Sequence, residues 1–294
     1  MSKQLFHSQH IALPQGKIEA IRNTHQSGNP VILAIHGWLD NAASFIPLIE
    51  QLPQYNWTAI DLPGHGFSFH RPQHSYYHFV DWVSDLVTLI RQEYNQKVIL
   101  VGHSLGGMLS TVIAGLYPEL VEKLVLIDAA GLVIQSEHDC AVQLRQALDS
   151  RNINVKQTKQ FSLDKAVNAR VNAGDISFNS AKLLVNRNVI KISEQDNEQD
   201  SEQNLEQWQW ASDKRLKSRS PLRLSQSQAQ DIIENITAPT LMCLADQGDQ
   251  YMKTNFDLFS PCYKNLITAN VKGHHHCHMD NALEVSQVIK SFID

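Results

Sequence analysis

Residues 98–107 read Val98-Ile99-Leu100-Val101-Gly102-His103-Ser104-Leu105-Gly106-Gly107. The apolar run at the start predicts a buried strand, and the apolar spacing that continues to Leu116 predicts a helix over 105–116. A serine between the two sits on a sharp strand-to-helix turn, which needs glycine or another small residue on each side. Such a turn pushes the Ser104 hydroxyl out of the sheet edge, above the N-terminus of the helix. The motif therefore predicts a nucleophilic serine.

The composition restricts the class of partner. Of the 294 residues, 43% are hydrophobic and 19% are charged, as in ordinary globular proteins with a large core. A net charge of -5 and a pI near 6.3 argue against binding to nucleic acid or to an anionic membrane. The N-terminus has no signal-peptide pattern, and no apolar run approaches the roughly 18 residues of a membrane span. We expect a cytoplasmic protein with a small neutral partner.

Cysteine usage supports this expectation. The chain has four cysteines without Cys-x-x-Cys spacing, which is typical of free thiols rather than of a disulfide framework. They are Cys140, Cys243, Cys262 and Cys277.

Short apolar and β-branched runs recur along the chain. They predict a hairpin at 7–13 and 17–22, and then strands at 31–35, 57–61, 98–101, 124–127, 239–244 and 266–271. Helical spacing at 76–94, 105–116 and 283–292 alternates with these strands. Because alternating strands and helices form parallel sheets, the predicted fold class is α/β, with a doubly wound, mostly parallel sheet.

The alternation pauses for about a hundred residues after 127. Within the pause, the segments 140–148, 163–171 and 181–192 have helical apolar spacing. We therefore predict a core made of residues 1–131 and 237–294, and an inserted, mainly helical cap over 132–236. Inside that cap, 194–206 is acidic and glutamine-rich, and a solvated surface is its simplest interpretation.

A serine nucleophile needs a base to take its proton and an acid to orient the base. In a strand–turn–helix site of this kind the order along the chain is serine, acid, histidine. After the last predicted strand the sequence reads Gly273-His274-His275-His276-Cys277-His278-Met279-Asp280. A metal site is the other interpretation of such a loop. Consecutive residues point in different directions and no second cluster offers a matching pair of ligands, so we expect no metal and a histidine base.

Four stretches together resemble the α/β-hydrolase superfamily and its serine-hydrolase-like subgroup, and the resemblance extends over residues 31–131 and 239–294. The stretches are Ile35–Asn41 (IHGWLDN), Asp61–Ser68 (DLPGHGFS), Gly102–Gly107 (GHSLGG) and Gly273–Asp280 (GHHHCHMD). The resemblance implies the α/β-hydrolase fold, in which the catalytic histidine precedes by five residues an acidic residue that opens the final helix.

Counting back from Asp280 gives His275 as the base, with His276 and His278 as alternatives. One oxyanion N–H is expected from Leu105, directly after the serine, at the helix N-terminus. The resemblance implies that the second comes from Trp38.

Three aspartates compete for the role of the acid. In the family the acid usually follows the strand at 239–244, where Asp246 and Asp249 stand one residue away from the common spacing. Some members use an acid at the end of the strand after the nucleophile helix, and that position is Asp128 here. We favour Asp128 and keep Asp249 and Asp246 as alternatives.

These features predict a serine hydrolase that acts on a carboxylic ester or a related acyl compound through a Ser-His-Asp triad and an acyl-enzyme, without a cofactor. A cofactor-free perhydrolase or a C–C bond hydrolase would use the same triad, and a non-catalytic ligand-binding protein can have the same fold. The cap suggests a small to medium, partly hydrophobic substrate. The residues that bind substrate and the oligomeric state cannot be assigned from the sequence.

Overall fold

The computed structural model of the protein describes residues 6–23, 26–151, 160–192, 207–221, 223–248 and 250–294. The acidic segment 194–206 and Asp249 lie outside the described residues.

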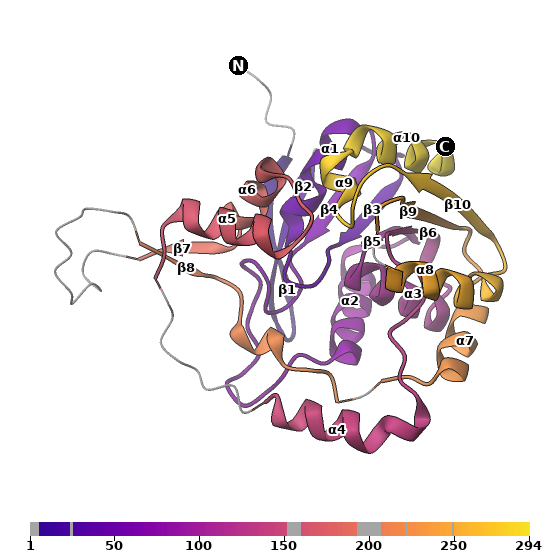
Figure 1. Ribbon diagram of the computed structural model, residues 1–294. Coiled ribbons are helices and arrows are strands. Elements are labelled where there is room, and N and C mark those ends of the chain that lie inside the picture. Colours follow the sequence, from indigo (N-terminus) through magenta and orange to yellow (C-terminus); the bar gives the residue numbers. More distant parts are fainter. Residues whose placement is uncertain (1–5, 24–25, 152–159, 193–206, 222, 249) are drawn as a thin grey trace, which may run out of the picture.

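An eight-stranded sheet with the order β1-β2-β4-β3-β5-β6-β9-β10 forms the centre of the molecule (Figure 1). The six strands from β4 to β10 in this order run parallel, whereas β1 and β2 form an antiparallel hairpin that joins β4 antiparallel. This is the doubly wound, mostly parallel sheet predicted from the alternation of strands and helices. The strands are β1 (Phe6–Leu13), β2 (Gly16–Asn23), β3 (Val31–Ile35), β4 (Asn56–Ile60), β5 (Val98–His103), β6 (Val121–Ile127), β9 (Thr240–Ala245) and β10 (Leu266–Val271).

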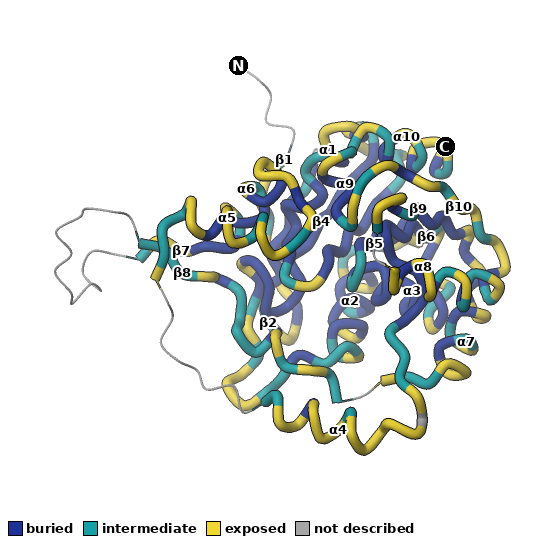
Figure 2. The backbone as a smooth tube through the Cα atoms, in the orientation of Figure 1, coloured by how far each residue is buried: buried dark blue, intermediate teal, exposed yellow. Residues whose placement is uncertain are grey.

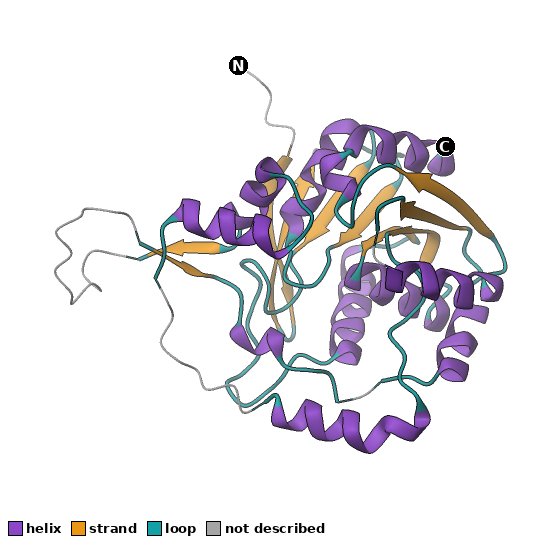
Figure 3. Ribbon diagram, in the orientation of Figure 1, coloured by secondary structure: helices purple, strands orange, loops and turns teal. Residues whose placement is uncertain are grey.

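Helices cover both faces of the sheet (Figure 3). Alternate residues of β3 explain why its sequence is apolar throughout: Leu33 and Ile35 pack with residues of α2 and α3, whereas Ile32 and Ala34 pack with residues of α1 and α10 on the opposite face. The core helices are α1 (Ile46–Gln51), α2 (Phe79–Glu93), α3 (Leu105–Leu116), α7 (Gln226–Glu234), α8 (Gln250–Phe259), α9 (Cys277–Asp280) and α10 (Ala282–Ile293).

The segment between β6 and β9 contains a second, smaller apolar cluster built around α5 and α6. The elements of this segment are α4 (Cys140–Asp149), α5 (Leu163–Ala173), α6 (Phe178–Asn186) and the antiparallel pair β7 (Val189–Lys191) and β8 (Trp208–Trp210), followed by α7. In Figure 1, α5 and α6 lie beside the sheet, and α4 lies apart from both. Figure 2 shows α4 as mostly exposed, and Ala147 is its one buried residue.

Two details of the predicted cap differ from the structure. The predicted helix at 181–192 ends at Asn186, because the β-branched residues Val189 and Ile190 pair with β8 instead of continuing the helix. Helix α7 lies inside the range 132–236, yet its buried Ala229 and Ile233 belong to the main core. The boundaries at 131 and 236 stay a prediction. Among the described residues, no helix combines the length and the apolar character needed to cross a bilayer.

Candidate active site

Ser104 occupies the turn between β5 and α3 in a backbone conformation that few non-glycine residues adopt, with φ 50° and ψ -118°. Its N–H donates to the carbonyl of Ile127 at 3.2 Å, which holds the turn against the end of β6. The turn is also close to β3, because a Cβ atom at Gly106 would lie 1.9 Å from the carbonyl oxygen of Ile35. A glycine is therefore required at position 106, two residues after the serine, because β3 approaches so closely, as the motif predicts.

Asp128 follows directly on Ile127 and lies beside this turn. Its side chain is buried, its N–H donates to the carbonyl of Cys243 at 2.8 Å, and its Oδ1 accepts from the N–H of Ala245 at 3.2 Å. The remaining oxygen, Oδ2, lies 2.6 Å from Nδ1 of His275. Because an ionised carboxylate only accepts hydrogen bonds, the proton of the neutral imidazole is on Nδ1, and Nε2 carries a lone pair.

The histidines of the loop after β10 have four different environments. His275 contacts Asp128, and its side chain is 30% exposed. His274 is 48% exposed and faces Asp175. His276 lies beside Asp40, a residue of the loop after β3.

His278 is fully buried, with its ring 4.2 Å from the ring of His103. Burial lowers the pKa of His278 to about 3, with a smaller contribution from His276. Among the alternatives for the base, the structure therefore brings neither His276 nor His278 to Asp128.

Of the two alternative acids, Asp246 is described by the structure and Asp249 is not. Asp246 accepts a hydrogen bond from the N–H of Gly273 at 2.8 Å through Oδ1, and it thereby holds the start of the histidine loop. Asp249 lies outside the described residues. Of the candidates within the described chain, Asp128 is the one that contacts His275.

Leu105 and Trp38 are the two residues whose backbone N–H groups are expected to form an oxyanion site. Leu105 is the first residue of α3, and Trp38 lies in the loop after β3. Neither of these N–H groups donates to another described residue in the hydrogen bonds that the structure shows. The side chain of Trp38 is 52% exposed, and its Nε1–H donates to the carbonyl of Leu216 at 3.1 Å. The indole therefore reaches from the core to the segment between β6 and β9, while the main-chain N–H of Trp38 stays without an acceptor among the described residues.

His36 braces the loop that carries Trp38. Its Nδ1–H donates to the carbonyl of Gly37 at 2.7 Å, and its Nε2 accepts from the N–H of Leu62 at 2.9 Å. Burial lowers the pKa of His36, so the ring remains neutral, as its two hydrogen bonds require.

A polar cluster of buried side chains lies behind the candidate triad. Asp40 accepts from Nη2 of Arg170 on α5 at 2.7 Å through Oδ1, and its Oδ2 lies 3.2 Å from Nε2 of His276. His103, the residue before Ser104, donates from Nε2 to the carbonyl of His275 at 2.8 Å. Burial would raise the pKa of Asp40, but the hydrogen bond with His276 and the charge of Arg170 hold it well below its ordinary range. Sequence reasoning missed this cluster, because its members come from four distant segments and no local spacing links them.

Other polar contacts attach α6 to the loops at the same edge of the sheet. Arg187 pairs with the buried Asp61 at 3.0 Å, and the hydroxyl of Ser180 donates to Asp280 at 2.6 Å. The side-chain amide of Asn41 donates to the carbonyl of Leu184 at 2.8 Å. The small apolar cluster is thus held over the candidate site by contacts with residues that the sequence stretches IHGWLDN, DLPGHGFS and GHHHCHMD supply.

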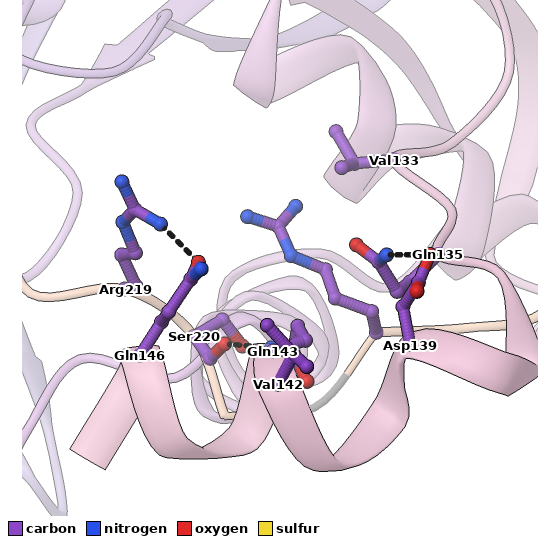
Figure 4. A pocket seen from close by; sticks show the side chains of 9 residues that line it. Val133, Gln135, Asp139, Val142, Gln143, Gln146, Arg219 and Ser220 are labelled. Carbon is purple, nitrogen blue, oxygen red and sulfur yellow. Dashed lines mark hydrogen bonds between the residues drawn. The ribbon is translucent and has the colours of Figure 1, made fainter. Parts of the chain in front are cut away.

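A hollow of about 430 Å³ lies between α4 and the residues Arg219, Ser220 and Arg223 (Figure 4). Its side-chain amides already have partners: Gln146 accepts from Arg219 at 2.6 Å, and Gln143 donates to the carbonyl of Ser220 at 2.7 Å. The lining is more polar than the partly hydrophobic substrate expected from the sequence would require. The residues that line it are Val133, Gln135, Asp139, Val142, Gln143, Gln146, Arg219, Ser220 and Arg223.

Comparisons with known proteins agree with this architecture. Residues 30–254 match the model of the alpha/beta hydrolase fold family. A serine hydrolase-like protein of Danio rerio is 27% identical over 302 residues, which cover 96% of this chain and 87% of that protein. A probable serine hydrolase of Drosophila melanogaster is 39% identical over 188 residues, which cover 60% of this chain and 56% of the fly protein.

A solved structure is similar over the whole length. The crystal structure of a hypothetical protein from Pseudomonas aeruginosa PAO1 has a TM-score of 0.86 and 30% identity, and the match covers 97% of this chain and 99% of that one. Since the family model spans most of the sequence and the sheet is doubly wound and mostly parallel, as predicted, the chain belongs to the alpha/beta hydrolase fold family, with relatives named serine hydrolase-like proteins.

Proposed function

We propose that the protein is a serine hydrolase of carboxylic esters or related acyl compounds, with Ser104, His275 and Asp128 as its catalytic triad. The observation that carries the proposal is the 2.6 Å contact between Nδ1 of His275 and Oδ2 of the buried Asp128, at a strand end directly beside the Ser104 turn. A serine is a weak nucleophile, and this arrangement supplies the oriented base that it needs.

In the proposed reaction, Nε2 of His275 takes the Ser104 proton as Oγ attacks the acyl carbonyl, and Asp128 stabilises the imidazolium. The tetrahedral oxyanion accepts hydrogen bonds from the N–H groups of Trp38 and Leu105. His275 then returns the proton to the leaving alcohol, which departs and leaves an acyl-enzyme. Water, activated by the same histidine, hydrolyses the acyl-enzyme and releases the acid.

A covalent probe tests the nucleophile directly. A fluorophosphonate should label the wild-type protein, and Ser104→Ala should abolish the labelling. Ser110→Ala is the matched control, since Ser110 is a buried serine on the same helix whose hydroxyl donates to the carbonyl of Gly106, and it should keep the labelling. Labelling that persists in Ser104→Ala would overturn the assignment.

Turnover separates an enzyme from a binding protein with the same fold. Chromogenic esters of increasing acyl length should be hydrolysed by the wild type, and hydrolysis by Ser104→Ala should fall to the background rate. A wild-type protein that binds these esters in a calorimeter but hydrolyses none of them would refute catalysis and favour a ligand-binding role.

A further inference from the structure

Three potential metal ligands converge in the interior behind the candidate triad. They are the carboxylate of Asp40 and the imidazoles of His103 and His276, and all three residues are buried. One ligand atom from each lies within 4.8 Å of the others. Oδ2 of Asp40 is 3.2 Å from Nε2 of His276 and 3.8 Å from Nδ1 of His103.

The tautomer of His103 leaves a lone pair directed at Asp40. Because the carbonyl of His275 can only accept, His103 carries its proton on Nε2, and its Nδ1 has no hydrogen-bond partner within the described residues. Histidines that bind metals typically donate their other N–H to a carbonyl or a carboxylate, which fixes the ring and makes the ligand more basic. His103 has this arrangement already.

His276 presents a second imidazole nitrogen to the same place. Its Nε2 lies 3.2 Å from Oδ2 of Asp40 and 3.1 Å from Nη2 of Arg170. Without an ion, the Nε2–H donates to the Asp40 carboxylate, and a bound metal ion would displace that proton. Two imidazole nitrogens and a carboxylate therefore face one small region, which is a donor set suited to a borderline cation such as Zn²⁺.

The missing side chain at Gly37 keeps two of the ligand atoms uncrowded. A Cβ atom at Gly37 would lie 3.0 Å from Nδ1 of His103 and 3.2 Å from Oδ2 of Asp40, so a larger residue here would crowd these two ligand atoms. Tetrahedral zinc with bonds of about 2.1 Å separates its ligand atoms by roughly 3.4 Å. The observed separations of 3.2 and 3.8 Å lie on either side of that value.

The positive charge in this cluster is supplied by the cap segment. Nη2 of Arg170, on α5, lies 2.7 Å from Oδ1 of Asp40 and 3.1 Å from Nε2 of His276. The guanidinium therefore binds the same carboxylate that a metal ion would use and lies against the same imidazole nitrogen. Its side chain is 21% exposed, so it can withdraw towards solvent, and a water molecule can then complete the coordination.

We propose that Asp40, His103 and His276 form a binding site for a divalent transition-metal ion of the Zn²⁺ type, in competition with the guanidinium of Arg170, and that occupation of this site inhibits the enzyme. The inhibitory part rests on the proposed function, whereas binding does not. The ligands adjoin Ser104, His275 and the loop that carries Trp38. An ion that draws them together would misplace these groups, and a displacement of about 1 Å at a catalytic group can cost on the order of a hundredfold in rate.

Binding is tested first without reference to activity. Calorimetry with Zn²⁺ should give one site in the wild type, and Co²⁺ should give the visible absorption of a four-coordinate complex. His276→Gln and His103→Gln should each weaken binding by at least about tenfold. His274→Gln is the matched control, because His274 is an exposed neighbour in the same loop, and it should bind like the wild type.

Arg170→Met should change the Zn²⁺ affinity in the opposite direction, and this result does not depend on how well the ligand variants fold. Removing the competing guanidinium should tighten Zn²⁺ binding by at least about tenfold and lower the Zn²⁺ concentration that halves ester hydrolysis by a similar factor. Unchanged affinity in Arg170→Met, or wild-type affinity in both His276→Gln and His103→Gln, would overturn the site. If the protein hydrolyses no ester, the proposed function fails, but the calorimetric and Co²⁺ results still decide the site.

Discussion

Replacing Asp128 by asparagine is the most informative perturbation of the proposed triad, because its effect follows from two hydrogen bonds. Oδ1 of Asp128 accepts from the N–H of Ala245 at 3.2 Å, and Oδ2 accepts from Nδ1 of His275 at 2.6 Å. An asparagine can satisfy the Ala245 N–H only with its carbonyl oxygen, which places its NH₂ group opposite His275. His275 must then accept at Nδ1 and carry its proton on Nε2, where it can no longer take the proton of Ser104.

The magnitude follows from this tautomer argument. In serine hydrolases the corresponding aspartate-to-asparagine change lowers kcat by about 10⁴-fold, or roughly 5.5 kcal/mol of transition-state stabilisation. Because the Asp128 side chain is almost fully buried, water cannot substitute for the carboxylate. We expect a loss in kcat of about 10³- to 10⁴-fold for Asp128→Asn, with the fold intact.

Asp246→Asn is the matched control. Asp246 accepts from the N–H of Gly273 through one oxygen, and the carbonyl of an asparagine can accept that bond equally well, so kcat should remain within a few-fold of the wild type. The assay is hydrolysis of a chromogenic ester, with thermal unfolding of each variant as the check on folding. A loss of less than about tenfold in Asp128→Asn, or an equal loss in Asp246→Asn, would refute the assignment of the acid.

Three further predictions concern the turn, the buried histidine and the oxyanion loop. Gly106→Ala should lower the free energy of unfolding in urea by at least about 2 kcal/mol, because its Cβ would meet the carbonyl of Ile35 at 1.9 Å; a change below about 0.5 kcal/mol would contradict the close approach of β3 to the turn. The pKa of His278 is about 3 in the folded protein, against an ordinary value of 6.5. Between these two pH values the unfolded chain binds more protons than the folded protein. The contribution of the neutral His278 to stability is therefore fully present above pH 6.5 and is lost as the pH falls. The free energy of unfolding should fall by up to about 1.4 kcal/mol per pH unit from this group as the pH drops below 6.5, and His278→Leu should flatten that slope in urea titrations at several pH values. Trp38→Phe removes the bond to the carbonyl of Leu216 but keeps the main-chain N–H, so kcat should fall less than about tenfold, whereas loss of an oxyanion donor costs about 10²- to 10³-fold.

The core of the fold could be predicted because its signals are local. Fully buried strands such as β3 and β5 need unbroken apolar runs, and those runs mark the parallel sheet directly. Helix α3 begins and ends where its apolar spacing does. The segment after β6 was harder: Val189 and Ile190 extend the helical spacing of α6, but pairing with Trp208–Trp210 places them in a strand. That pairing depends on residues far along the chain, which no local pattern contains.

The candidate site also contains residues that have a local sequence signal and residues that have none. Ser104 could be predicted because the turn itself imposes a sequence, and a resemblance to a known family supplied the register of the histidine loop. The contact that favours Asp128 over Asp246 depends on the positions of two neighbouring strand ends, so the sequence left open the choice among Asp128, Asp246 and Asp249. The contact between Arg170 and Asp40 joins α5 to the loop after β3, and Asp40 and His276 meet only because their loops end at the same sheet edge.

The four histidines of the loop after β10 can be told apart only by the directions in which their side chains point in the folded structure. Their imidazoles are chemically identical, yet the tight turn after β10 sends them in different directions: His274 to solvent, His275 to Asp128, His276 to Asp40 and His278 into the core. A shift of the register by one residue would exchange an exposed ring for a buried one and a carboxylate partner for another. Chemical role in this loop is therefore set by the direction of each Cβ, and it is this direction that separates a proposed base at His275 from a proposed metal ligand at His276.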